Sequence, residues 1–516
     1  MSASRRRRLV AGVLTLTAAL LASACSSGGG GSETDSSTVT MMVPLFGTAP
    51  DPKGEMQQAV EKLVGKKLQI TWVPNADYND KTNVTLASDK MPQIMVIQGD
   101  KTSSFVRAAQ AGAFWDLTDK LDKYPNLKNR DAQTVRNSST NGKIYGLYRI
   151  RPLLRSAVVI NKQWMDKLKL KTPETVDDLY DIAKAFTEKD PDGNGKKDTY
   201  GLIIPKWPSP QYGSASPYDV IETWFGAPNV WGERDGKLVP GFDTPEFIEA
   251  NKFVKKMVDE GLVNPDYATL DSAKWNDPFV QGKGGMIIDV NVRGTNLLDL
   301  LKEKDPNDFD KVLTVGNLKR SDGKKFSYPF TGYNGVIAIP RQSVQTEQQL
   351  DEVLAVLDKL ASKEGGILLS NGLEGRNFKV QDGGAARISQ DDPKVKQIQQ
   401  DVDKAFIQLG TTASVGLGAY PDIYPDKPHQ DQVTLRNKLA EEDLKTAVHN
   451  PALAVMAPTT IAKGQTLDPI ITDARIKFIS GAIDEAGLKA EIKRWYDNGG
   501  TQIAAETNDL VSKLGN

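Results

Sequence analysis

The residues from Asp190 to Asp198 have the spacing of a calcium-binding loop. Oxygen-bearing side chains occupy loop positions 1, 3, 5 and 9, as Asp190, Asp192, Asn194 and Asp198. Gly195 stands at position 6, where the chain must turn sharply, and the backbone carbonyl of Lys196 would supply a further ligand. Position 12 is Gly201 instead of a bidentate Glu, so water or another segment must complete the coordination. The pattern predicts a structural Ca²⁺ site; the alternative is an Asp/Asn/Gly-rich turn without metal.

Other catalytic and metal chemistry has few residues available. The chain has one cysteine, Cys25, and two histidines, His429 and His449. An intrachain disulfide is therefore excluded, and Cys/His zinc sites and Cys–His nucleophilic pairs are disfavoured. Among 516 residues, 65 Lys and Arg face 66 Asp and Glu, a net charge of −1. Such a balance gives no field for nucleic acid or for an anionic membrane surface.

The N-terminus resembles the signal of a bacterial lipoprotein. Arg5–Arg8 are positive, and Leu9–Leu21 form an apolar run too short to span a membrane comfortably. Small residues then precede Cys25, as in a lipobox, which implies that Cys25 carries lipid after cleavage. We expect residues 1–24 to be the signal peptide and residues 25–37, rich in Gly and Ser, to be a flexible tether. Plain secretion with an unmodified Cys25 is the alternative.

The remaining chain predicts an α/β protein. Apolar runs typical of strands alternate with stretches of helical spacing, which favours βαβ units and mostly parallel sheets. Thr175 with Asp178, and Thr346 with Gln349, resemble capping boxes, and Thr244 precedes a proline at the first position of a helix. The predicted buried strands include 38–44, 68–73, 94–97, 156–161, 284–290 and 336–339.

Several segments together resemble the solute-binding lipoproteins of bacterial ABC importers, in particular the carbohydrate-binding branch that includes alginate-oligosaccharide-binding proteins. They run in order through the mature chain: MPQIM (91–95), NGKIYGL (141–147), DPDGNGKKDTYG (190–201), WFGAPN (224–229), EGLVNPD (260–266), KWNDPFVQGKGGMIIDV (274–290), YNGVIAIP (333–340), LEGRNF (373–378) and WYDNGG (495–500). Gln93 stands where the family usually has Asp.

The resemblance implies two α/β lobes, joined by hinge crossovers, that close on a ligand in a cleft between them. It places crossings near Tyr148–Pro152, Pro329–Asn334 and Arg376–Val380. One lobe would comprise residues 38–148 plus 333–377, and the other residues 152–330 plus 380–516. It also implies a lipid-anchored, extracytoplasmic monomer that delivers its ligand to ABC permease subunits and does no chemistry itself.

A sugar ligand needs aromatic rings for its C–H face and planar polar groups for its hydroxyl rim. In α/β lobes, ligands meet the carboxyl ends of strands. Residues that follow predicted strands are therefore expected to bind ligand: Phe46, Gln98, Asp100, Asp289, Asn291 and Arg293. Residues near the expected crossings are added: Tyr148, Arg151, Tyr333, Asn334, Glu374 and Arg376. Trp207 and Trp224 follow as aromatic candidates, with Tyr420 and Tyr424 in a later loop.

Each assignment has an alternative. Amphipathic spacing favours core packing for Trp224 and Trp275. Glu374 and Arg376 could pair with each other across a turn. A secreted glycoside hydrolase or lyase, an adhesin or sensor lipoprotein, and a binding protein for peptides or another solute are the alternative functions.

Overall fold

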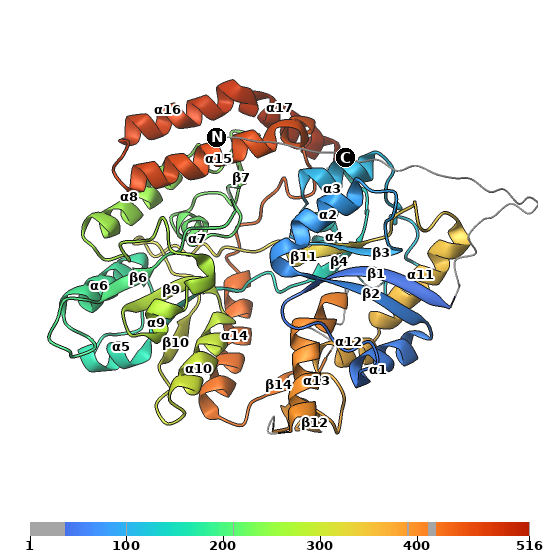
Figure 1. Ribbon diagram of the computed structural model, residues 1–516. Coiled ribbons are helices and arrows are strands. Elements are labelled where there is room, and N and C mark those ends of the chain that lie inside the picture. The colour runs from blue at the N-terminus through green and yellow to red at the C-terminus, as the bar shows by residue number, and fades with distance from the viewer. Residues whose placement is uncertain are drawn as a thin grey trace, which may run out of the picture.

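The structure is a computed structural model that describes residues 37–99, 101–128, 130–209, 211–389, 392–410 and 419–514. The expected signal peptide, the tether up to residue 36, Cys25 and Asp100 lie outside these ranges. Within them, two lobes lie side by side, each built around its own sheet (Figure 1). The expected α/β class is confirmed.

The first lobe contains a five-stranded sheet in the order β2-β1-β3-β11-β4. Its strands are β1 (Thr38–Leu45), β2 (Lys67–Pro74), β3 (Ile94–Ile97), β4 (Leu147–Ile150) and β11 (Tyr333–Ala338). Every residue of β3 and β4 is buried. For this reason β3 appears in the sequence as a short apolar run, whereas β4 contains the buried Arg149. The helices of this lobe are α1 (Glu55–Val64), α2 (Tyr78–Leu86), α3 (Ser103–Gln110), α4 (Ala132–Ser138), α11 (Glu347–Leu360), α12 (Lys363–Ser370) and α13 (Pro393–Lys404).

The second lobe contains a four-stranded sheet in the order β10-β5-β9-β6. Its strands are β5 (Ser156–Asn161), β6 (Tyr200–Ile203), β9 (Gly284–Val290) and β10 (Val312–Val315), beside a hairpin of β7 (Trp231–Arg234) and β8 (Lys237–Pro240). Its helices are α5 (Lys162–Leu168), α6 (Val176–Glu188), α7 (Pro217–Trp224), α8 (Pro245–Asp259), α9 (Asp277–Val280), α10 (Arg293–Lys304) and α14 (Lys427–Leu444). The capping boxes expected at Thr175 and Thr346 are both formed, and the hydroxyl of Thr244 accepts from the N–H of Phe247.

The expectation of mostly parallel sheets is wrong for the second lobe. There, β5 runs antiparallel to both β9 and β10, and the β6–β9 pair is parallel. In the first sheet, β11 is antiparallel to β3 and β4. The reason is topological: β5 and β11 each enter a sheet directly from the other lobe, so they begin at the edge where neighbouring strands end.

The expected third crossing near Arg376–Val380 is also wrong. After β12 (Phe378–Gln381) and β13 (Gly384–Arg387), the chain continues into α13, which contacts α1 of the first lobe. Apolar side chains that had been assigned to the second lobe belong instead to the first core: Ile398, Val402, Phe406 and Leu409. The chain returns to the second lobe only at α14, after β14 (Asp422–Ile423) has paired with β13.

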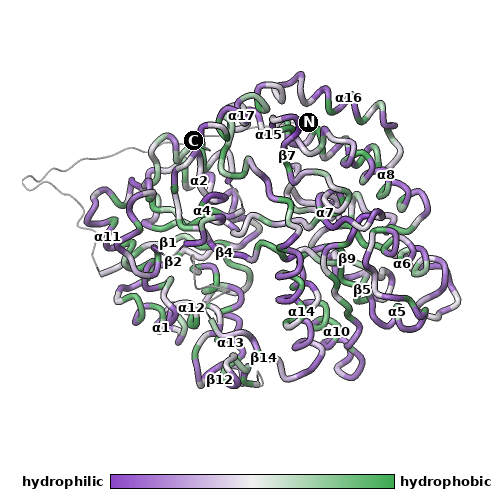
Figure 2. The backbone as a smooth tube through the Cα atoms, turned by 180° about the vertical axis from the view of Figure 1, so that it is seen from behind, coloured by the Kyte–Doolittle hydropathy of each residue, from purple (hydrophilic) through white to green (hydrophobic). Residues whose placement is uncertain are grey.

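The C-terminal helices α15 (Pro458–Ile479), α16 (Glu485–Trp495) and α17 (Thr501–Leu514) lie along one end of the molecule. From behind, they run above both lobes (Figure 2). Helix α15 contacts α3 of the first lobe and α8 of the second. Buried Arg475 on α15 binds Asp219 at 2.9 Å and Glu222 at 3.1 Å on α7, which joins this helix to the second lobe.

The observed third crossing runs from β14 to α14, and His429 lies at its end, in the first turn of α14. Its Nδ1 lies 2.6 Å from Asp426 and its Nε2 lies 3.1 Å from Asp299 on α10, while its ring stacks on Tyr424 at 5.1 Å. Its side chain is 2% exposed. Burial lowers the pKa of His429, but hydrogen bonds and charge from Asp299 and Asp426 more than offset this, so the pKa is raised above 6.5.

The His429→Asn variant is therefore expected to lose more stability in acid than in base. A histidine whose folded pKa is raised stabilises the fold fully below about pH 6.5, and this contribution disappears as pH rises through the folded value. We expect a loss of about 2 kcal/mol at pH 5.5 and a smaller one at pH 9, measured by urea unfolding. The control is exposed His449→Asn. A loss that does not change with pH would contradict the assignment.

Candidate functional site

One edge of the first sheet gathers several predicted residues. Because β1 and β3 are parallel and β11 is antiparallel to β3 and β4, the ends of β1, β3 and β4 share an edge with the start of β11. Residues at this edge are Phe46, Gln98, Arg151, Tyr333 and Asn334. Phe46 is 47% exposed, as a ring that stacks on a ligand must be. Gln98 donates to Asn75 Oδ1 at 2.8 Å.

The second sheet gathers the others in the same way. The ends of β6 and β9 share an edge with the start of β5, because β5 is antiparallel to β9 and β6 is parallel to it. Asp289 and Asn291 lie here, and Arg293 begins α10 directly after them. The backbone N–H of Asn291 donates to Arg155 O at 2.6 Å, which joins the end of β9 to the residue before β5.

A short crossing brings these two edges close together. Residues 151–155 alone separate the end of β4 from the start of β5. Such a segment spans at most about 20 Å when fully extended. Two backbone hydrogen bonds tie it to the second crossing, from Arg151 N to Gly332 O at 2.9 Å and from Phe330 N to Leu153 O at 2.8 Å. The Arg155 guanidinium also lies over the Phe330 ring, 4.2 Å from its centroid.

The second-lobe edge carries an ordered set of aromatic and planar groups. Arg293 donates to Asp289 and to Asn276, both at 2.5 Å, and its guanidinium lies 4.2 Å from the centroid of Trp275. Trp207 packs edge-on against Trp275 at 5.9 Å and donates to Ser214 Oγ at 2.9 Å. Each of these side chains is held by another, so the surface is rigid before ligand binds.

The contacts at these two edges also involve Asn75, Arg155, Asn276 and Phe330, which the sequence analysis does not name as site residues. Arg155 directly precedes a predicted strand, so the start of an antiparallel strand was the available signal. In a parallel sheet the start of a strand lies at the opposite edge from the ends of its neighbours, so the expectation of mostly parallel sheets does not point to Arg155. Trp275 was interpreted as a core residue, and it is indeed 3% exposed, yet its ring supports Arg293.

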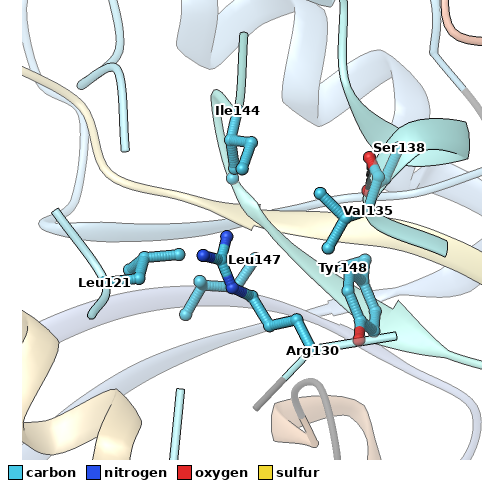
Figure 3. A pocket seen from close by; sticks show the side chains of 8 residues that line it. Leu121, Arg130, Val135, Ser138, Ile144, Leu147 and Tyr148 are labelled. Carbon is cyan, nitrogen blue, oxygen red and sulfur yellow. Dashed lines mark hydrogen bonds between the residues drawn. The ribbon is translucent and has the colours of Figure 1, made fainter. Parts of the chain in front are cut away.

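Three predicted aromatic residues lie in the lobe cores instead. Trp224 is fully buried and donates to Asn317 Oδ1 at 2.9 Å. The backbone of Tyr333 begins β11 at the edge described above, but its side chain is 2% exposed and packs in the first core. Tyr148 is 3% exposed, and its hydroxyl accepts from Asp131 N at 3.1 Å. It faces an internal cavity of about 10 Å³ together with Arg130 and Ile144 (Figure 3), which is room for about one water and not for a sugar ring.

Glu374 and Arg376 lie on another face of the first lobe. They line a surface hollow of about 400 Å³ with α1 and Leu373. Arg376 does not pair with Glu374; its Nε and Nη2 donate to Glu55 at 2.8 and 2.5 Å. The other proposed loop residues also have partners within the protein. The backbone of Tyr420 bonds the Asn371 amide, and Tyr424 stacks on His429 in the third crossing.

The loop from Asp190 to Asp198 has converging acidic side chains. Asp190 accepts from the backbone N–H groups of Gly193, Asn194 and Gly195 at 3.0–3.1 Å. The Asn194 amide lies 2.6 Å from Asp192 and 3.1 Å from Asp198. Partial desolvation, followed by the neighbouring Asp190 and Asp198, raises the pKa of Asp192. Crowded negative charge of this kind suits a cation.

The carboxylates nevertheless converge on an amide N–H group. In the part of the chain that the structure describes, no three His, Cys, Asp or Glu side chains already form a metal cage. Rotation of the Asn194 amide by half a turn would present its oxygen to the same centre, as a Ca²⁺ ligand requires. The rotation would also break the hydrogen bond that Asn194 Oδ1 accepts from the N–H of Lys196 at 2.7 Å.

Comparison with known proteins places this geometry in a family. Residues 49–367 match the family described as bacterial extracellular solute-binding protein. Over 474 residues the chain is 40% identical to lipoprotein LipO of Bacillus subtilis (strain 168), an alignment that covers 92% of each protein. The chain belongs to this family.

Two further similarities extend the assignment. This solute-binding protein is 34% identical over 462 residues to the polygalacturonan/rhamnogalacturonan-binding protein YtcQ of Bacillus subtilis (strain 168), covering 90% of this chain and 89% of that one. It shares its fold with an EF-hand mutant of the substrate-binding protein FusA from Streptococcus pneumoniae, solved with fructo-nystose. The TM-score is 0.67 at 18% identity, covering 93% and 99% of the two chains. The two-lobe fold expected from the sequence is confirmed. Among the described residues, no helix combines the length and apolarity needed to cross a membrane.

Proposed function

We propose that this solute-binding protein captures an oligosaccharide between its lobes and delivers it to the permease of an ABC importer. The observation that supports this proposal is the pair of sheet edges joined by the short crossing at residues 151–155, one with exposed Phe46 and the other with the Arg293–Trp275 stack. Rings and planar polar groups are what a sugar requires. The relative named for binding polygalacturonan and rhamnogalacturonan supports the same class of ligand, and the structural neighbour solved with fructo-nystose is consistent with it.

We also infer that the chain binds its ligand without altering it, and that it works as a monomer. Asp289 is ion-paired to Arg293 at 2.5 Å, which suits orientation of a ligand better than proton transfer. Closure of the lobes needs only differential contact: a tenfold preference for the closed state corresponds to about 1.4 kcal/mol.

Replacing Asp289 and Asn291 together by alanine is expected to weaken binding by well over tenfold. The change removes two planar groups and releases Arg293 from its position over Trp275. A thermal-shift panel of mono- and oligosaccharides selects the ligand, and calorimetry measures its affinity.

The matched control for this pair is exposed Asp310→Ala. Unchanged affinity in the double variant would remove the second-lobe edge from the site. New reducing ends after incubation with oligosaccharides would indicate a hydrolase or lyase instead of a binding protein. If only peptides or other non-sugar solutes bind in the panel, the protein is a binding protein for a non-sugar solute.

We propose further that the 190–198 loop holds a structural Ca²⁺. Asp190, Asp192, Asn194 and Asp198 would supply side-chain oxygens and Lys196 its carbonyl. The ion would neutralise the crowded carboxylates and brace the connection between α6 and β6.

The Asp192→Ala, Asp198→Ala variant should lose the calcium response of the protein. We expect Ca²⁺ to raise the melting temperature of the parent by several degrees and to leave the variant unchanged, because only the folded parent loop binds the ion. Scanning calorimetry with Ca²⁺ or with EDTA measures this. Exposed Asp308→Ala is the control, and an equal calcium response in parent and variant would contradict the site.

Localisation follows from the N-terminus. We propose that lipid on Cys25 holds the protein at the outer surface of the cytoplasmic membrane, near its permease, where confinement raises the effective concentration.

The Cys25→Ser variant is expected to leave the membrane fraction. Without the thiol no lipid can be attached, so the protein should appear in the medium or periplasm on immunoblots of fractionated cells. The matched control is Ser26→Ala, which keeps the cysteine. Retention of the Cys25→Ser protein on the membrane would indicate another anchor.

A further inference from the structure

Arg149 of β4 and Arg151, the residue directly after β4, lie at the first-lobe edge. Among the described residues, neither has a carboxylate partner. Arg149 and Arg151 are two residues apart in extended chain, so they point to the same face of the sheet. Arg149 is 1% exposed. Its Nη1 donates to the backbone carbonyl of Asn334 at 2.9 Å and its Nη2 donates to Gln408, both neutral groups. Its buried Nε has no hydrogen-bond partner.

Arg151 is the more accessible member of the pair. It is partly exposed and stands where the first crossing leaves the sheet. Its Nη1 donates to the carbonyl of Ile150 at 2.7 Å. Burial lowers its pKa. Within the described ranges, no acidic side chain forms a salt bridge with either guanidinium.

Buried Arg475 and partly buried Arg293, by contrast, both have carboxylate partners. Arg475 lies between Asp219 and Glu222, and Arg293 is paired with Asp289. Two uncompensated cations side by side are costly, because each loses hydration and each repels the other. Both effects act on Arg149: burial first, and then the charge of Arg151, lower its pKa to about 9.

We propose that the ligand is an acidic oligosaccharide, whose sugar carboxylate binds Arg151 and compensates the charge of Arg149 behind it. This inference rests on the proposed function and narrows its substrate class. A guanidinium matches a carboxylate through two parallel hydrogen bonds, and such charge-assisted bonds are about twice as strong as neutral ones. Arg151 follows β4 at the same edge where Phe46 follows β1 and Gln98 follows β3. An oligosaccharide that lies along this edge can therefore stack on Phe46 and pair with Arg151 through different sugar units.

The test compares sugars that differ only in charge. Tri-galacturonate and tri-mannuronate are each measured by calorimetry against the same trimer with its carboxyl groups reduced to CH₂OH. We expect at least one acid trimer to bind tenfold or more tightly than its reduced form. Arg151→Gln should cut the affinity for that acid by tenfold or more and weaken binding of the reduced trimer much less, while Arg151→Lys should lose less affinity for the acid than Arg151→Gln does.

The control is exposed Arg494→Gln on α16, with thermal unfolding used to verify that each variant is folded. If Arg151→Gln does not fold, the inference is tested by the parent protein alone, through the ratio of its affinities for the acid trimer and for the reduced trimer. Equal affinity for acid and reduced trimers, tighter binding of neutral sugars, or equal losses of both in Arg151→Gln would overturn the inference and leave oligosaccharide capture standing. Binding of no saccharide at all would overturn the proposed function with it.

Discussion

The five-residue crossing from Arg151 to Arg155 is the constraint on which the rest of the structure depends. A segment this short forces the edge where β4 ends to lie near the edge where β5 begins. It also makes β5 antiparallel to β9, because β5 starts at the edge of the sheet where β9 ends. The second crossing returns the chain in the same manner, and β11 enters the first sheet antiparallel to its neighbours. The strand ends that carry the proposed ligand-binding side chains are thus brought near each other by connectivity alone.

The other connections between the lobes add polar anchors to this frame. His429 lies between Asp299 and Asp426 where the chain re-enters the second lobe, and Arg475 secures α15 to α7 through two carboxylates. Arg475 is a buried charge with partners, and His429 is one when it is protonated. Removing a partner from a buried charge costs far more than breaking a surface ion pair. A binding protein that opens and closes needs fixed attachment points of this kind, so that motion is confined to the short segments between them.

Electrostatics divides the two faces of the proposed site. The second-lobe edge is internally neutralised, because Asp289 holds Arg293 over Trp275. At the first-lobe edge, Arg149 and Arg151 have only neutral partners among the described residues. The side chains of the second-lobe edge are therefore already held by one another. The first-lobe edge keeps uncompensated positive charge, which an anionic ligand can neutralise. Closure of the lobes would bring the second face against a sugar held by the first.

Local signals in the sequence determined the elements of this protein. Capping boxes at Thr175 and Thr346 and the apolar runs of the strands act within a few residues, and each is present in the structure. The strand-exit residues Phe46, Gln98, Asp289, Asn291 and Arg293 could be named for the same reason, since a strand end is a local property. Strand direction, the third crossing and the pairing of charges depended on tertiary structure. Arg376 binds Glu55 across 321 residues, and Phe406 joins a core begun by β1. No local pattern encodes such partners, because they are selected by packing between segments that meet only when the chain has folded.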